Sequence, residues 1–331
     1  VDDVVESSDG TPIVFNWVAA AVDETTEFAV VAEAVDASGN SGTANRSVTV
    51  DPFINADAPV VTISCPISGD GCVPGGTTSL QFHMIDPNDG DEIFGYALYV
   101  DGDLYGEVDL QDDPGDTREV SGVFDWVAPE DALPGQEFSL RLEAVDKTDN
   151  VGYTIVHLTV LDGTILSGDQ LLTSDYASAD LVLLDGTFTA TTALQPESLT
   201  LLGGAKLTTQ NLQQLLVQTT GNVSITCGAS IDVSSRGYGA NETYPGATLN
   251  TDNEGAGSHL GEGGERGNNT PGSTYGSVTR PQEAGAGGRH DTNGRRGGGV
   301  VRIEAETVSL EGAVRANGGD ATTTEWHVPG G

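Results

Sequence analysis

The sequence predicts an all-β protein in which β-sandwich modules, one half and one complete, are followed by a parallel β-solenoid. Three observations support this prediction. A segment of the first half recurs at the spacing of a sandwich module, short runs of alternating apolar and polar residues lie between turn residues, and glycines follow the alternating runs in the second half of the chain. Each part of the prediction rests on its own stretch of sequence.

The repeat joins residues 14–50 to residues 123–160. It matches Trp17 to Trp126, Phe28 to Phe138 and Val50 to Val160. The period is about 110 residues, which is typical of a β-sandwich module. We therefore predict two modules, listed here by their bounds: the C-terminal half of one sandwich over residues 1–52, and a complete sandwich over residues 57–162.

A half sandwich leaves its core and its sheet edges open. We therefore expect the missing strands of the first copy either to precede Val1 in a longer protein or to come from a neighbouring chain. Within the complete copy, Phe138, Leu140 and Leu142 alternate with polar residues, which is the pattern of a strand with one buried face.

Three motifs carry a resemblance to known modules. They are the F-x-W strand, the AVDASGN and AVDKTDN turns that precede a V-x-V strand, and IDPNDGDEI at residues 85–93. The first two resemble bacterial Ig-like and cadherin-like modules of large secreted surface proteins. The third is similar to the DPDGD turn of cadherin-like and PKD-like repeats, with Asn88 as an extra residue. The resemblance covers about half the chain and implies Ig-like sandwiches at the cell surface or outside the cell.

The pattern changes after residue 163. Apolar alternation now recurs beside glycine in LVLLDGTF, LTLLGGAKL, VSITCGASIDV and VRIEAETVSLEGAV. The glycines that follow these strands are Gly186, Gly204, Gly228 and Gly312. Their first two spacings equal the length of one coil of a solenoid, and the third contains an insertion. We predict a β-solenoid over residues 163–331.

The insertion covers residues 236–299 and is too rich in glycine and polar residues to form a core of its own. We expect a long, semi-ordered lobe packed on one face of the solenoid. Its blocks, together with GGGVVRIEAETVSLEGAVRANGG at residues 297–319, resemble the glycine-rich β-helix segments of giant bacterial surface proteins. We interpret residues 297–319 as one coil of the solenoid wall, in which Val301, Ile303 and Ala305 face inward.

The charge of the protein excludes some partners. The 331 residues carry a net charge of -37, and residues 1–163 hold 32 Asp and Glu against four Lys and Arg. Such a surface repels nucleic acid, because phosphate binding depends on Lys and Arg. The sequence contains neither an apolar stretch long enough to span a bilayer nor a signal peptide, so we expect no membrane insertion by this chain.

The three cysteines favour an oxidising compartment. Cys65 and Cys72 flank a short polar loop, SCPISGDGCV, and we predict a local disulfide between them. Cys227 alternates with Val223 and Ile225, which indicates a buried, unreactive thiol. We therefore expect an extracellular or cell-surface protein.

Calcium is the cofactor that the acidic turns favour. A hard cation binds six to eight oxygen atoms, which Asp, Asn and backbone carbonyl groups in turns can supply. The alternative is that Asp, Asn and Gly only form tight turns. The candidate ligands are Asp86, Asn88, Asp89, Asp91, Glu92, Asp101, Asp103, Asp36 and Asp146.

The lobe contains the candidates for ligand binding. Tyr238, Tyr244 and Tyr275 could form an aromatic platform for a surface glycan. A polysaccharide lyase or hydrolase would use converging basic and acidic side chains. Those candidates are Arg289, His290, Asp291, Arg295, Arg296 and Asp320. Since arginines in a glycine-rich lobe also bridge backbone carbonyls, we assign no catalytic residue.

These observations predict a non-enzymatic, extracellular structural or adhesive protein, a segment of a surface fibre, filament or stalk. We expect it to assemble through β-strand edges, either by self-association or with neighbouring domains of a larger chain. The alternatives are a polysaccharide-active β-helix enzyme and a glycan-binding adhesin with accessory Ig-like modules.

Overall fold

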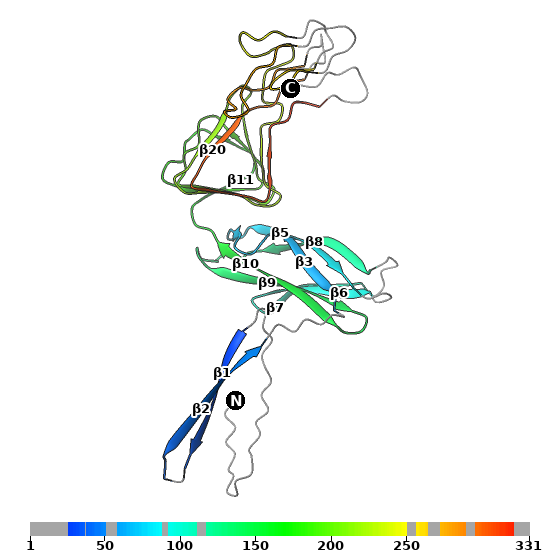
Figure 1. The fold of residues 1–331 in the computed structure, drawn as a ribbon, viewed down its shortest axis with the longest axis vertical. Helices are drawn as coiled ribbons and strands as arrows, with labels where there is room; N and C mark the ends of the chain where they lie inside the picture. The colour runs from blue at the N-terminus through cyan, green and yellow to red at the C-terminus, as the bar shows by residue number, and fades with distance from the viewer. Residues whose placement is uncertain are drawn as a thin grey trace. The chain divides into compact units, whose positions relative to one another are not determined.

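The computed structural model describes residues 26–36, 38–50, 58–87, 92–110, 117–249, 256–263, 272–288 and 295–320. The chain divides into two compact units, residues 1–58 and residues 59–331 (Figure 1). The described residues form strands, turns and loops, and they include no helix that could cross a membrane. The predicted all-β fold is confirmed.

The first unit contains an antiparallel hairpin of β1 (Thr26–Val35) and β2 (Ser41–Val50). Thr26 lies opposite Val50, and Val35 lies opposite Ser41. In the described part of the chain, these two strands pair only with each other, and most of their residues are exposed. The hairpin thus corresponds to the last two strands of the predicted half sandwich, whereas Trp17 lies outside the described residues.

A β-sandwich opens the second unit. One sheet has the strand order β3-β5-β8 and the other has the order β4-β10-β9-β6-β7. The bounds are β3 Val60–Cys65, β4 Gly71–Cys72, β5 Thr77–Ile85, β6 Ile93–Val100, β7 Asp103–Asp109, β8 Glu119–Val127, β9 Glu137–Asp146 and β10 Val151–Val160. Apart from β4 and β10, which run parallel, the paired strands are antiparallel.

The sandwich core lies between the two sheets. Along β9, buried and partly exposed side chains alternate, as the period-2 sequence predicts. Leu140 and Leu142 are fully buried, and the ring of Phe138 packs 5.1 Å from that of Trp126 on β8. Burial of each large side chain stabilises the fold by about 1.5 to 3 kcal/mol. The repeated Trp and Phe of the sequence are therefore core residues here.

The rest of the second unit is a parallel solenoid with three faces. One sheet has the order β11-β13-β15-β18-β21, the second β12-β14-β16-β19-β22, and the third consists of β17 and β20. The bounds are β11 Thr164–Ser167, β12 Gln170–Leu172, β13 Asp180–Leu184, β14 Thr187–Ala190, β15 Ser198–Leu202, β16 Lys206–Thr209, β17 Leu215–Gln218, β18 Asn222–Ile225, β19 Ser230–Asp232, β20 Val301–Glu304, β21 Thr307–Leu310 and β22 Ala313–Arg315.

Successive coils stack equivalent side chains in rows. Leu183 pairs with Leu201, Leu201 with Ile225, and Ile225 with Leu310. The first three of these residues are fully buried in the solenoid core. Glycine allows the corners between strands, because Gly228 has a φ of 80°, which residues with a side chain rarely adopt.

The stretch at residues 297–319 forms one coil, as predicted. It supplies β20, β21 and β22 in turn, one strand to each of the three sheets. Val301, Ile303 and Ala305 pack against the solenoid core.

The glycine-rich insertion enters between β19 and β20. Its segments pair through backbone hydrogen bonds from Gly237 N to Gly297 O at 2.7 Å and from Tyr238 N to Gly285 O at 3.0 Å. A Cβ atom on Gly297 would lie 1.9 Å from Gly285 O, so only glycine permits this close approach. Backbone contacts therefore order the described part of the lobe, which has few apolar side chains to bury.

Candidate functional site

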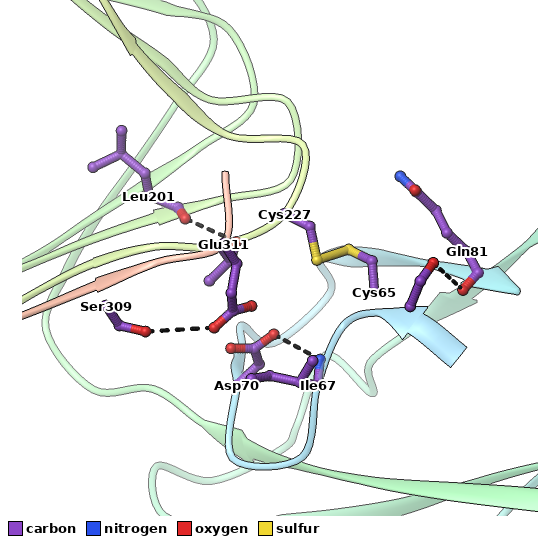
Figure 2. Close-up of a disulfide and its surroundings, with 10 residues drawn as sticks. Cys65, Ile67, Asp70, Gln81, Leu201, Cys227, Ser309 and Glu311 are labelled. Carbon is purple, nitrogen blue, oxygen red and sulfur yellow. Dashed lines mark hydrogen bonds between the residues drawn. A yellow bond between two sulfur atoms is a disulfide. The ribbon is translucent and has the colours of Figure 1, made fainter. Parts of the chain in front are cut away.

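A disulfide joins the sandwich to the solenoid. It links Cys65, the last residue of β3, to Cys227, which lies between β18 and β19, across a sequence separation of 162 residues (Figure 2). The predicted bridge between Cys65 and Cys72 is therefore wrong, and so is the prediction of a free thiol at Cys227. A disulfide persists in oxidising environments, so this bond favours an extracellular location.

The two sandwich cysteines lie in different sheets, which explains their different partners. Cys72, on β4, packs into the core between the sheets and is 1% exposed. On β3, the register shifts between Ile63 and Cys65, and Cys65 bonds to the solenoid. Burial raises the pKa of the free Cys72 thiol to about 11, so this thiol stays protonated at neutral pH.

An apolar cluster covers the outer face of the solenoid beside the disulfide. Val182 on β13 and Leu202 on β15 are buried with Val73 of the sandwich, and Leu161 and Leu184 pack against them. The neighbours of Val182 in β13 point into the solenoid core, so this strand is buried on both faces. The continuous apolar run LVLL, in place of strict alternation, is the sequence signal for such a strand.

Two carboxyl groups from the two domains also meet here. Asp70 lies between β3 and β4 and accepts a hydrogen bond from Ile67 N at 3.0 Å. Its carboxyl group faces that of Glu311, which lies between β21 and β22, with oxygen atoms of the two groups within 4.8 Å of each other (Figure 2). Burial raises the pKa of both carboxyl groups, and the charge of Asp70 raises that of Glu311 further. A shared proton would relieve the repulsion between them.

A cavity of about 310 Å³ lies at the same junction. All three cysteines line it, together with Asp70 and Asp185, and its described lining contains no Lys, Arg or His. The Sγ of Cys227 lies within 4.8 Å of ligand atoms of Asp70 and Glu311. Because that sulfur is bonded in the disulfide and is no thiolate, the group offers only two carboxyl ligands.

The two repeated turns use their aspartates as hydrogen-bond acceptors. Oδ1 of Asp36 accepts from the backbone N–H of Ser38 and Asn40, and Oδ2 accepts from Asn40 Nδ2. These bonds from Asn40, its side chain first, lower the pKa of Asp36.

Asp146 holds the equivalent turn in the same way, with Thr148 and Asn150 as donors. Burial raises the pKa of Asp146, but the hydrogen bonds from Asn150 and Thr148 outweigh it, and the pKa lies below its usual value. In both turns the carboxylate oxygens bind the turn itself, which supports the alternative of tight turns over calcium ligation.

The remaining described calcium candidates do not gather into a shared site. Asp101 has a φ of 51° in the two-residue turn between β6 and β7, and its Oδ1 accepts from Ser139 N at 2.8 Å. Asp103 begins β7, Asp86 is fully buried, and Glu92 pairs with Lys147. Over the described ranges, none of the candidates joins a group of three potential ligands. Three more lie outside those ranges: Asn88, Asp89 and Asp91.

The tyrosines of the lobe do come together. The rings of Tyr244 and Tyr275 stack 5.2 Å apart, and His259 packs edge-on against Tyr275. The Tyr275 hydroxyl donates to Ala284 O at 2.8 Å, and burial raises its pKa to about 12. Tyr238 lies close enough for its charge to affect Tyr275, while Tyr244 remains 39% exposed.

Two of the candidate arginines of the lobe, Arg295 and Arg296, lie in its described part. Arg296 donates from its guanidinium to Gly237 O at 2.8 Å and so braces the lobe backbone. The backbone carbonyl of Arg295 accepts a hydrogen bond from Gly288 N in the lobe. The side chain of Asp320 is exposed. The other candidates, Arg289, His290 and Asp291, lie outside the described residues.

Comparisons with known proteins identify no family and give only weak structural similarities. No protein-family model and no curated protein matches the sequence. Among solved structures, the fibronectin(III)-like modules of Clostridium thermocellum CbhA are 18% identical with a TM-score of 0.22, over 31% of this chain and 97% of theirs. The family 28 exopolygalacturonase of Yersinia enterocolitica is 13% identical with a TM-score of 0.25, over 51% of this chain and 42% of its own. The strand order and pairing of the chain, and not these weak similarities, show an Ig-like sandwich of two sheets followed by parallel stacked sheets like those of a β-helix.

Proposed function

We propose that this chain is a non-enzymatic structural segment of an extracellular fibre or stalk, assembled through β-strand edges. The observation that carries this proposal is the uncovered row of apolar side chains on the last described coil. Leu310 stands in register with the fully buried Ile225, yet it is 54% exposed. Val308 and Val314 continue other rows in the same way, at 51% and 43% exposure.

The strands that carry these side chains are also sheet edges. In the described part of the chain, β21 and β22 each end a five-stranded sheet, at the side opposite β11 and β12. A surface that covers them must supply parallel strands about 4.8 Å away and apolar side chains on the inner face. A further solenoid coil has this chemistry, whether it comes from a second copy or from a neighbouring repeat of a larger chain.

Self-association can be tested with paired lysine substitutions. Val308→Lys with Leu310→Lys places charge in the uncovered row, while Val278→Lys is the matched control at an 84% exposed position in the lobe. We expect the unsubstituted chain and the control to form concentration-dependent oligomers in sedimentation velocity and end-to-end particles in electron micrographs. The double variant should stay monomeric. A wild-type chain that is monomeric at all concentrations would contradict assembly between copies.

The hairpin β1–β2 offers a second contact surface for assembly, because the two strands form a two-stranded sheet among the described residues and most of their residues are exposed. Deletion of residues 1–52 should therefore reduce oligomer size in the same sedimentation experiment. Normal assembly of the shortened chain would show that this hairpin has no part in it.

We also propose that calcium stabilises the sandwich through residues 86–92, where Asp86 is fully buried and Glu92 follows Asp89 and Asp91 in the sequence. The expected result is a higher melting temperature in calcium chloride than in chelator. Asp101→Asn should retain this difference, since Oδ1 of Asp101 already binds Ser139 N. Equal melting temperatures would remove the calcium proposal.

The stacked tyrosines favour glycan binding as a second candidate function. Sugar rings pack against exposed aromatic faces, and Tyr244 is the exposed member of the Tyr244–Tyr275 stack. Tyr244→Ala should then abolish retention on a surface-glycan array, whereas Tyr105→Ala, at a 44% exposed position in the sandwich, should not.

A further inference from the structure

The disulfide closes a covalent ring over most of the second unit. Residues 65–227 lie in the ring, which includes β4 through β10 of the sandwich and β11 through β18 of the solenoid. Outside the ring, the second unit retains the first five residues of β3 on one side. On the other side it retains β19, the lobe and β20 through β22.

The disulfide offers a short covalent path for tension between the two ends of the ring. A chain pulled at its two ends transmits tension along the backbone to Cys65, across the disulfide to Cys227, and onward. The backbone between the cysteines carries no share of this tension, since the covalent path through the two sulfurs spans a Cα–Cα distance of only 5.9 Å.

We propose that the Cys65–Cys227 disulfide is a mechanical clamp that carries tension past the sandwich and the first solenoid coils. This role deepens the proposed function, because a fibre or stalk segment transmits load between its ends. The clamp itself is a property of the chain and does not depend on assembly.

Tension can separate the strands outside the ring from their neighbours. β20, β21 and β22 pair with β17, β18 and β19 by parallel ladders, which can be peeled away one strand at a time. Peeling stops at Cys227, because the chain beyond it is in the ring. On the other side, peeling of β3 from β5 stops at Cys65. The apolar cluster of Val73, Val182 and Leu202 lies entirely inside the ring, so tension leaves it intact.

The clamp predicts a specific length in single-molecule pulling. The full chain is held by handles at its two ends in an optical trap and is extended before and after addition of a reducing agent. In the oxidised chain, the disulfide prevents the backbone between the two cysteines from extending. At about 3.3 to 3.6 Å for each residue, the 162-residue separation corresponds to roughly 530 to 580 Å of hidden contour length. We expect this length to appear on reduction, together with the unfolding of the sandwich.

The same pulling measurement distinguishes a Cys65–Cys227 disulfide from a Cys65–Cys72 disulfide. A bond between Cys65 and Cys72 would hide only about 25 Å, because the two residues are close in sequence. Cys72→Ala should keep the full hidden length, and Cys227→Ser should lose it without a reducing agent. Reduction of the unsubstituted chain in the trap gives the comparison even if Cys227→Ser folds poorly.

Equal contour lengths before and after reduction would overturn the clamp, as would the short hidden length of a Cys65–Cys72 bond. Failure of the proposed fibre function is a separate result. It would appear as a monomer in sedimentation while the hidden length in the trap stays unchanged.

Discussion

The hairpins β1–β2 and β9–β10 have the same sequence pattern and the same turn, but opposite burial. Leu140 on β9 is fully buried, whereas its counterpart Val30 on β1 is 40% exposed. Both turns are closed by an aspartate that binds an asparagine four residues later. The difference lies in the neighbouring strands. β9 pairs with β6, β10 pairs with β4, and Phe138 on β9 packs against Trp126 of the opposite sheet. Among the described strands, β1 and β2 pair only with each other.

This comparison separates local from tertiary causes. Alternation and an Asp-Asn turn suffice to specify a hairpin, because both act within about ten residues. They do not bury it, because burial needs a second sheet, and an isolated hairpin is marginally stable in water.

The disulfide should stabilise only the hairpin that lies inside its ring. Replacement of both Cys65 and Cys227 by Ser should lower the free energy of unfolding of the second unit by about 5 kcal/mol in the chain-entropy model, given the 162-residue loop. Hydrogen exchange should accelerate in β9 and β10 and stay unchanged in β1 and β2. Acceleration in both hairpins would show that their stabilities are coupled.

Truncation of matched core positions should affect the hairpins unequally. Leu140→Ala should cost about 2 to 5 kcal/mol, because it leaves a cavity in a closely packed core. Val30→Ala, at the equivalent exposed position, should stay within about 0.5 kcal/mol. Guanidinium denaturation followed by tryptophan fluorescence measures both. A large loss for Val30→Ala would mean that another surface covers this hairpin in solution.

The turn aspartates should show a smaller contrast. Asp146→Ala leaves the part-buried donors of Thr148 and Asn150 without this acceptor, at a cost of about 1 to 3 kcal/mol. At the exposed Asp36, water can replace the carboxylate, so Asp36→Ala should have little effect. The same denaturation experiment compares them, and equal losses would contradict the role assigned to burial.

The pH dependence should have opposite signs at the turns and at the junction. The lowered pKa of Asp146 gives stability that is present above its ordinary value of 3.8 and is lost as pH falls through the folded-state pKa. The raised pKa values of Asp70 and Glu311 give stability that is fully present below their ordinary values of 3.8 and 4.5 and is lost as pH rises through the raised, folded-state pKa values.

Glu311→Gln should therefore raise the free energy of unfolding at pH 7, by less than about 1 kcal/mol because water screens this partly exposed group. The gain should be smaller at pH 4, where the wild-type pair already holds its proton. Urea midpoints at the two pH values measure the difference, and a loss of stability at pH 7 would contradict the repulsion.

Much of the fold could be predicted because its signals are local. The module repeat, the alternation around Leu140 and the corner glycine at Gly228 each act within one strand, one turn or one module. Less of the junction could be predicted. The run LVLL at β13 indicates a strand buried on both faces, but it does not say that Val73 of the sandwich covers the outer face.

The cysteines show where sequence reasoning fails. Loop length favours Cys72 as the partner of Cys65, because closing a short loop costs little entropy. The fold overrides this preference by placing Cys72 in the opposite sheet and Cys227 beside Cys65. A contact between residues 162 positions apart leaves no trace in the local pattern of either segment.

By itself, the sequence determined the strand class, the module repeat, the solenoid coils and the acidic surface, since each follows from composition and short-range periodicity. Only the tertiary structure decided which hairpin is buried, which cysteines are joined and which rows of the solenoid stay uncovered. These outcomes depend on the surfaces that meet in space, and distant segments meet through packing that no single stretch of sequence encodes.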